Sequence, residues 1–284
     1  MAMTLIEQNS PYSHWEYVHP ESGDRLRIVP ERGGLVTAWC CNGRELLYLD
    51  QQRFADPGKS IRGGIPVLFP ICGNLPGNLL PLPSGEFTLQ QHGFARDLPW
   101  ELQLLGDNSG VKLSLGDTDA TRAAYPFEFL IEMRVRPVAN ALEIETTVHN
   151  RSQTAMPFSF GLHPYFNVTD LSKVRLEGLP NSCLNHLEMA EDETAIQLAH
   201  LTEGVDFLTR PAGQVSLVDE ASGRCLRLQH DKPMDFTVVW TDPPRQMVCL
   251  EPWTAPREAL ISGDRKLEIK PGSKQRLRCS LVSC

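Results

Sequence analysis

Positive charge is scarce in this sequence, and that scarcity excludes one class of ligand. The 284 residues include 27 lysines and arginines against 35 aspartates and glutamates, for a net charge of −8 and a pI near 5.5. A protein that binds nucleic acid needs a basic face that releases counterions from the phosphates. We therefore expect no nucleic-acid partner, and an anionic small ligand would need a local arginine pocket.

Long apolar runs are lacking as well. The longest one, Ile65–Ile71, reads IPVLFPI and contains two prolines, so it is too short to span a membrane. The first residues show no basic stretch followed by an apolar segment, which is the pattern of a secretory signal peptide. We predict a soluble cytoplasmic protein without a membrane partner, and its oligomeric state stays open.

Metal-binding cysteine patterns are missing too. Eight cysteines occur without a CxxC pair and without a histidine–cysteine cluster at zinc spacing, so we predict no metal site. Cys249 and Cys279 lie within alternating apolar segments. Free cysteine packs as a small core residue in a reducing compartment, and we expect these two to do so.

Helical periodicity over ten or more residues is also lacking, whereas alternation with a period of two is common. Residues 127–135 alternate in this way, and residues 141–150 place apolar side chains inward and Glu143 and Glu145 outward. A turn between them predicts a long hairpin. Similar short segments occur at residues 111–115, 173–179, 225–230, 236–240, 247–253, 266–270 and 276–282. We predict an all-β protein, an antiparallel sandwich or barrel, with a single domain over residues 1–284.

Residues 72–91, CGNLPGNLLPLPSGEFTLQQ, are the least regular part of the chain. Proline and glycine interrupt this stretch, so we predict a long excursion over one face of the molecule. Long loops in compact domains are often functional, which makes the flanking residues candidates for a site.

The segment FSFGLHPYF at residues 158–166 combines a core face with an open polar face. Alternation puts two phenylalanines and a leucine on one side, and Ser159, Gly161 and His163 on the other. This face carries a hydroxyl group, then no side chain, and then an imidazole. Such a face suits a ligand that approaches the backbone. A structural histidine beside a crowded glycine explains the segment equally well.

The segment MVCLEPW at residues 247–253 places Glu251 on the same face as Met247 and Cys249, while the other face is also apolar. An enclosed carboxyl group has a raised pKa, which suits a general base at neutral pH. A buried ion pair with an arginine such as Arg257 is the alternative.

Arg62, His92 and Arg96 belong to the segments IRGGIPVLFPICG and QQHGFARDLPW, which flank the irregular stretch. Adjacent glycines free the backbone, so two guanidinium groups and one imidazole could converge there. Surface ion pairs are the alternative for the arginines. Asp206, in GVDFL, is a weaker polar candidate, for which a turn cap is the alternative.

Taken together, the segments IRGGIPVLFPICG, QHGFARDLPWEL, GLHPYF and LEPW resemble the aldose 1-epimerase (galactose mutarotase-like) superfamily in order and spacing. The resemblance covers most of the chain and implies a large antiparallel β supersandwich. It also implies that His163 is the general acid, that Glu251 is the general base, and that His92 and Asp206 contact the sugar.

The implied reaction is mutarotation, in which one base and one acid open and reclose the sugar ring without a cofactor. The substrate would be a hexose or a hexose phosphate. The segments around Arg62 and Arg96 are similar to those with which hexose-6-phosphate mutarotases bind phosphate, but also to segments of epimerases that act on free sugars. A carbohydrate-binding protein without turnover remains an alternative. A glycoside hydrolase or lyase is another, although hydrolysis normally needs two carboxylates.

Overall fold

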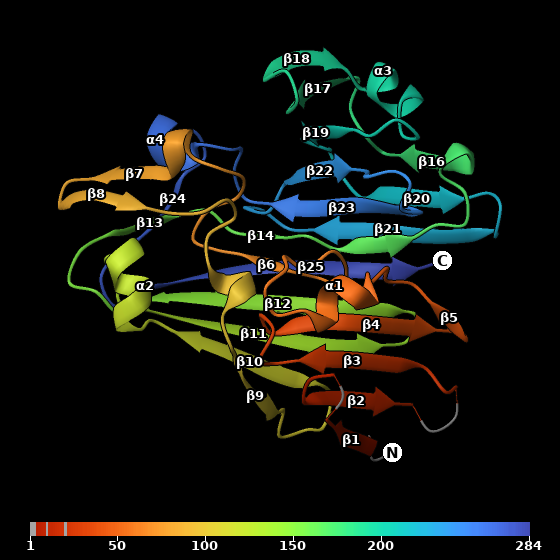
Figure 1. Cartoon of the computed structure of the whole chain (residues 1–284), viewed down its shortest axis with the longest axis horizontal. Coiled ribbons are helices and arrows are strands. Elements are labelled where there is room, and N and C mark those ends of the chain that lie inside the picture. The colour runs from red at the N-terminus through yellow and green to blue at the C-terminus, as the bar shows by residue number, and fades with distance from the viewer. Residues whose placement is uncertain (1–3, 10, 20–21) are drawn as a thin grey trace.

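The computed structural model describes residues 4–9, 11–19 and 22–284, and within them strands dominate (Figure 1). The N-terminal part forms a sheet in the order β1-β2-β3-β4-β5. Its strands are β1 (Thr4–Gln8), β2 (His14–Val18), β3 (Arg25–Val29), β4 (Leu35–Cys41) and β5 (Arg44–Glu45). The sequence pattern did not identify these strands, because they are short and their alternation is irregular.

One large sheet has the order β16-β20-β21-β25-β12-β11-β10-β9. Its strands are β9 (Glu101–Leu104), β10 (Val111–Gly116), β11 (Phe129–Val138), β12 (Ala141–Asn150), β16 (Val174–Glu177), β20 (Val215–Asp219), β21 (Arg224–His230) and β25 (Lys274–Ser283). The predicted hairpin is confirmed, since β11 and β12 pair antiparallel with Ile131 opposite Val148. Both side chains are fully buried, as alternation predicts, and burial of each contributes about 1.5–3 kcal/mol.

A second large sheet has the order β18-β17-β19-β22-β23-β14-β6, and β15 also pairs with β23. Its strands are β6 (Val67–Leu68), β14 (Gly161–Leu162), β15 (Tyr165–Asn167), β17 (Ser182–Asn185), β18 (Ala190–Glu193), β19 (Asp206–Thr209), β22 (Phe236–Trp240) and β23 (Met247–Trp253). Every residue of β23 is buried, because neighbouring strands and packed side chains cover both of its faces. The antiparallel pairings confirm the predicted all-β antiparallel supersandwich.

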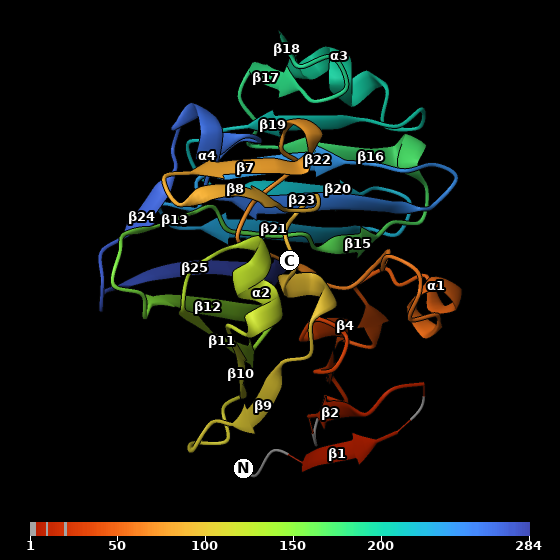
Figure 2. The same ribbon diagram turned by 60° about the vertical axis from the view of Figure 1, so that its left-hand side comes forward.

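The irregular stretch is more ordered than the sequence indicated. It contains a hairpin of β7 (Leu79–Leu82) and β8 (Gly85–Thr88), which lies beside α4 (Ala259–Ser262) in Figures 1 and 2. A further pair joins β13 (Met156–Phe158) to β24 (Leu267–Ile269). The remaining helices are short: α1 (Gln51–Ala55), α2 (Asp119–Ala124), α3 (Thr194–Ala199), and the 3₁₀ turns Pro76–Asn78, Ala95–Asp97 and Leu171–Lys173. In the described part of the chain, no helix has the length and apolar character needed to cross a membrane.

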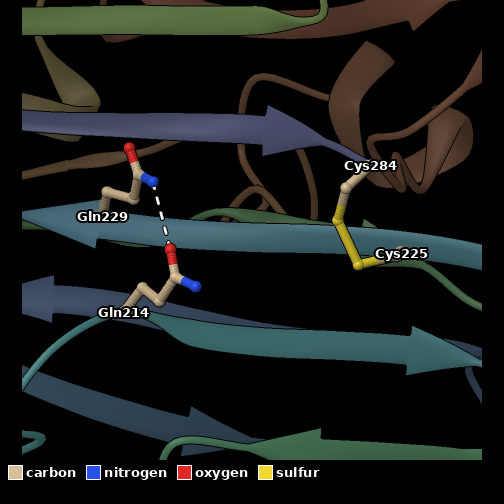
Figure 3. The surroundings of a disulfide bond; sticks show 4 residues. All are labelled: Gln214, Cys225, Gln229 and Cys284. Carbon is tan, nitrogen blue, oxygen red and sulfur yellow. Dashed lines mark hydrogen bonds between the residues drawn. A yellow bond between two sulfur atoms is a disulfide. The ribbon is translucent and has the colours of Figure 1, made fainter.

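The cysteines follow two patterns. Cys249 and Cys279 are buried and unbonded, as predicted. Cys225 on β21 forms a disulfide with Cys284, which ties the last residue of the chain to its neighbouring strand (Figure 3). Cysteine spacing alone did not indicate this bond, because the two residues become neighbours only when β21 pairs with β25.

Candidate active site

A cavity of about 430 Å³ lies over β22 and β23 and gathers every residue that the sequence singled out for chemistry. This volume falls in the range of small-molecule sites. The cavity is lined by Ser60, Arg62, Gln90, Gln91, His92, Arg96, His163, Tyr165, Asp206, Val238, Trp240, Glu251, Trp253 and Arg257. Residues from distant parts of the chain therefore meet at one place.

His163 and Glu251 face each other in this cavity. Nε2 of His163 lies 3.3 Å from Oε1 of Glu251. His163 directly follows β14, which pairs with β23 through Gly161 and Trp253, so the sheet brings the two side chains together. The glutamate is thus paired with the histidine, and the alternative of an ion pair with Arg257 is wrong.

Burial determines the protonation of this pair. It lowers the pKa of His163 to about 3, and the positive charge of Arg96 adds to the effect. Burial also raises the pKa of Glu251 well above its ordinary value, helped by the negative charge of Asp206. Both shifts favour the uncharged forms, a neutral imidazole beside a protonated carboxyl group, whereas the family resemblance implied a protonated His163 as the acid.

Aromatic rings fix the orientation of His163. Its ring stacks on Tyr165 with centroids 4.6 Å apart and planes 12° apart. Trp240 meets the imidazole edge-on at 5.8 Å. Nδ1 of His163 is buried without a hydrogen-bond partner among the described residues. The imidazole is therefore held by ring packing, and Nε2 is the nitrogen that faces Glu251.

His92 presents a hydrogen-bond donor to the cavity. Its Nδ1 accepts a hydrogen bond from the backbone N–H of Gly73 at 3.1 Å. Burial lowers its pKa well below the ordinary value, so the ring is neutral and the proton resides on Nε2. The residue adopts a positive φ of 67°, and a Cβ on the following Gly93 would lie 2.2 Å from the carbonyl oxygen of Phe69. Glycine at position 93 is therefore required for this tight turn.

Arg62 and Arg96 line the same cavity without hydrogen-bonded carboxylate partners among the described residues. The Arg62 guanidinium lies 5.7 Å from the centre of the Trp240 ring. Arg96 donates to the backbone carbonyl of Gln91 at 2.9 Å, and its Nε is 3.7 Å from the exposed carboxylate of Asp97. The predicted convergence is confirmed, and neither side chain is neutralised by a strong ion pair.

Asp206 opens β19 and is held by two partners that the sequence did not assign to it. His186 Nδ1 lies 2.7 Å from Oδ1, and Arg257 donates to Oδ2 at 2.6 Å. Burial raises the pKa of Asp206, but these two partners outweigh that effect and the net pKa is lowered. Asp206 is therefore an ionised member of a part-buried network, and the turn-cap alternative is wrong.

Trp253 is another site residue that the sequence did not single out. Its indole N–H donates to Oε2 of Glu251 at 3.1 Å. The sequence did contain a signal for Trp253, because it lies two residues after Glu251 on the same strand and such residues share a face. His186 and the Arg257–Asp206 pair could not be found this way, since they depend on strands that meet only in the folded chain.

One group of possible metal ligands occurs among the described residues. The ligand atoms of His163, Cys249 and Glu251 lie within 4.8 Å of one another. Burial raises the pKa of the Cys249 thiol well above its ordinary value, which disfavours the thiolate that a metal requires. The expectation that the chain needs no metal stays a prediction.

Comparisons with known proteins agree on one family. The sequence model described as "Aldose 1-epimerase" matches residues 22–281. A relative from Cenchrus ciliaris, described as "Putative glucose-6-phosphate 1-epimerase", is 28% identical over 88% of this chain and 78% of its own. A relative from Escherichia coli strain K12 with the same description is 28% identical over 86% of this chain and 82% of its own.

Solved structures show the same fold. The Slr1438 protein from Synechocystis sp. PCC 6803 has a TM-score of 0.91 and 34% identity, with 95% of each chain covered. Galactose 1-epimerase from Lactobacillus acidophilus NCFM has a TM-score of 0.76 and 15% identity, and 100% of this chain and 99% of that one are covered. The second likeness concerns the fold alone.

Proposed function

The chain belongs to the aldose 1-epimerase family, and from that membership we propose that its substrate is a hexose carrying a phosphate group. As a member, the chain is an isomerase that interconverts the α and β anomers of a hexose or hexose phosphate. The observation that carries the finer proposal is the pair Arg62 and Arg96, which line the cavity without hydrogen-bonded carboxylates among the described residues. The description of two relatives, which names glucose 6-phosphate, supports the same substrate class.

The charge balance of the cavity favours an anionic substrate. Among the described lining residues, the three arginines at 62, 96 and 257 oppose one ionised carboxylate, that of Asp206. The raised pKa of Glu251 and the lowered pKa values of both histidines shift those groups toward their uncharged forms. Guanidinium groups bind phosphate oxygens through paired N–H donors, so a phosphate group would be bound despite the acidic net charge of the chain.

The ring-opening chemistry is assigned to His163 and Glu251. Mutarotation removes a proton from the anomeric hydroxyl and delivers one to the ring oxygen, which leaves an open aldehyde. Rotation about the C1–C2 bond then allows closure from the other face. Glu251 is assigned as the base and His163 as the acid, and on closure the two exchange roles.

One shared proton is enough for this cycle. The neutral pair becomes an imidazolium beside a carboxylate when the proton moves from Glu251 to His163 along their 3.3 Å contact. The indole N–H of Trp253 and the positive charges of Arg257 and Arg96 favour the carboxylate form. The neutral His92, with its proton on Nε2, is suited to donate to the ring oxygen or a neighbouring hydroxyl.

Glycoside hydrolysis is a poorer fit to this site. Hydrolysis normally uses two carboxyl groups that flank one bond. Asp206 is the second carboxylate of the cavity lining, and both of its oxygens already accept hydrogen bonds from His186 and Arg257. These partners hold the carboxylate in place and ionised, and its remaining lone pairs suit it to accept a hydrogen bond from a sugar hydroxyl.

The test is to measure anomer exchange by NMR for glucose 6-phosphate, glucose and galactose with the purified protein. We expect kcat/KM for glucose 6-phosphate to exceed that for glucose by about 10-fold or more, the equivalent of one charge-assisted hydrogen bond. Inorganic phosphate should inhibit exchange of the phosphorylated sugar competitively. Equal kcat/KM values for the two glucose compounds would contradict the phosphate assignment while leaving the epimerase activity in place.

A further inference from the structure

The two carboxylate oxygens of Glu251 have different partners. Oε1 faces His163 at 3.3 Å, whereas Oε2 accepts the indole N–H of Trp253 at 3.1 Å. Because Glu251 and Trp253 are two residues apart on β23, both side chains project from the same face of the strand. The indole therefore binds Oε2 and leaves Oε1 available for proton transfer.

Two imidazole rings pack against the indole of Trp253. His186 stacks on it with centroids 6.0 Å apart and planes 25° apart. His92 meets it edge-on at 5.8 Å. The His186 ring is itself fixed, because its side chain is completely buried and its Nδ1 lies 2.7 Å from the ionised Asp206.

A glycine makes room for this arrangement. A Cβ at Gly161, which pairs with Trp253 across β14 and β23, would lie 2.6 Å from Cδ1 of the indole. Arg257 closes the other end of the network through its 2.6 Å hydrogen bond to Asp206. Contacts thus run continuously from Arg257 through Asp206, His186 and Trp253 to the proposed base.

We propose that Trp253, clamped by His186, is a positioning residue that directs its N–H to Glu251 and keeps the carboxylate of the base populated for ring opening. The inference rests on the proposed catalytic role of Glu251. The physical reason is that a buried carboxylate loses its hydration, and a fixed N–H donor restores part of that stabilisation. Without the donor, the proton would stay on Glu251 for a larger fraction of the time.

The test is Trp253→Phe, which removes the N–H and keeps an aromatic ring for His186 to pack against. We expect kcat to fall about 10- to 100-fold, as for the loss of one hydrogen bond to a charged group, while KM changes less. The pH profile of kcat/KM should shift toward higher pH, because the pKa of Glu251 rises further when the N–H is lost. Glucose is the substrate for the profile, since it does not ionise in this range.

Trp39→Phe is the matched control. Trp39 is a buried tryptophan on β4 and does not belong to the cavity lining. Its pH profile of kcat/KM should keep the wild-type position on the pH axis. A wild-type profile and kcat in Trp253→Phe, with only a lower Tm, would overturn the proposal and leave Trp253 a packing residue.

His186→Gln is a second variant, which tests the proposal even if Trp253→Phe does not fold. Glutamine keeps a donor for Asp206 and removes the ring that packs on the indole. In His186→Gln alone, we expect the pH profile of kcat/KM to shift in the same direction as in Trp253→Phe, but by less. The double variant should behave nearly like Trp253→Phe. Full additivity of the two changes would show that His186 does not act through Trp253.

Isotope-edited infrared titration of the Glu251 carboxyl band separates this proposal from the proposed function. The band reports the ionisation of Glu251 without turnover. A wild-type protein that accelerates no anomer exchange would refute the proposed function, yet the carboxyl titration should still move to higher pH in Trp253→Phe. An unmoved titration would refute the positioning role even in an active enzyme.

Discussion

Nε2 of His163 lies 3.3 Å from Oε1 of Glu251 in a buried pocket, and this contact allows two side chains to share one proton. Tyr165 stacks on the imidazole and Trp253 donates to the other carboxylate oxygen, so neighbouring side chains hold both partners. An acid and a base in contact are the minimum that anomer interconversion requires.

The pH dependence should reflect the pair and not an ordinary histidine. Burial lowers the pKa of His163 to about 3 and raises that of Glu251 well above normal, so the pair keeps one proton over a broad range. With glucose as substrate, kcat/KM should stay nearly flat as the pH is lowered from about 7 to about 5, because His163 titrates only near its lowered pKa of about 3. An acidic limb with an apparent pKa near 6.5, the ordinary histidine value, would contradict this account.

The arginines should discriminate between charged and neutral sugars. Replacement of Arg62 or Arg96 by methionine keeps the length of the side chain and removes the guanidinium group. We expect kcat/KM for glucose 6-phosphate to fall about 10- to 100-fold in each variant, with a smaller change for glucose. Arg210→Met is the control, because Arg210 pairs with Asp235 outside the cavity lining. Equal losses for both sugars would mean that the arginines do not recognise phosphate.

Gly161 should tolerate no side chain. A methyl group there would lie 2.6 Å from the Trp253 ring and 3.0 Å from Sγ of Cys72. We expect Gly161→Ala to lower the free energy of unfolding by about 1–3 kcal/mol and to reduce kcat as the indole is displaced. Gly116→Ala, with nothing within 4 Å of the added atom, is the control and should change stability little. Wild-type activity in Gly161→Ala would show that the position of the indole is not critical.

Glu251→Gln should stabilise the fold at alkaline pH. The folded-state pKa of Glu251 is raised, so its contribution to stability is fully present below the unfolded value and is lost as pH rises through the folded pKa. Glutamine does not titrate, so the stability of the variant does not fall in this way as pH rises. The Tm of the variant should therefore exceed that of the wild type at pH 8 by a few degrees, or about 1 kcal/mol, and the difference should shrink toward pH 5. Calorimetry that gave the same difference at both pH values would argue against a buried, titrating carboxyl group.

Local alternation in the sequence predicted much of the fold and the two central side chains. The burial of Ile131 and Val148 follows from a period of two, and the enclosure of Glu251 follows from the apolar residues on both faces of its segment. Alternation gives the face of a residue but not its neighbours. The ion pair between Arg257 and Asp206 was therefore out of reach, because it depends on which strands become adjacent.

The protonation state of the site was out of reach for a related reason. The residue type of His163 indicates an acid or base near neutral pH, whereas its lowered pKa results from burial and from Arg96, which another segment supplies. The stretch before His92 likewise read as irregular, since its Pro and Gly content masks the β7–β8 hairpin. Short strands that alternate weakly are stabilised by tertiary pairing and not by local pattern.

The central claim is that His163 and Glu251 together interconvert the anomers of a hexose phosphate, and NMR exchange spectroscopy of glucose 6-phosphate tests it most directly. The wild-type protein should accelerate exchange between the two anomeric proton signals, and Glu251→Gln and His163→Asn should each lose about 10²- to 10⁴-fold of that acceleration. Folded variants that exchange the anomers within a few-fold of the wild-type rate would contradict the account.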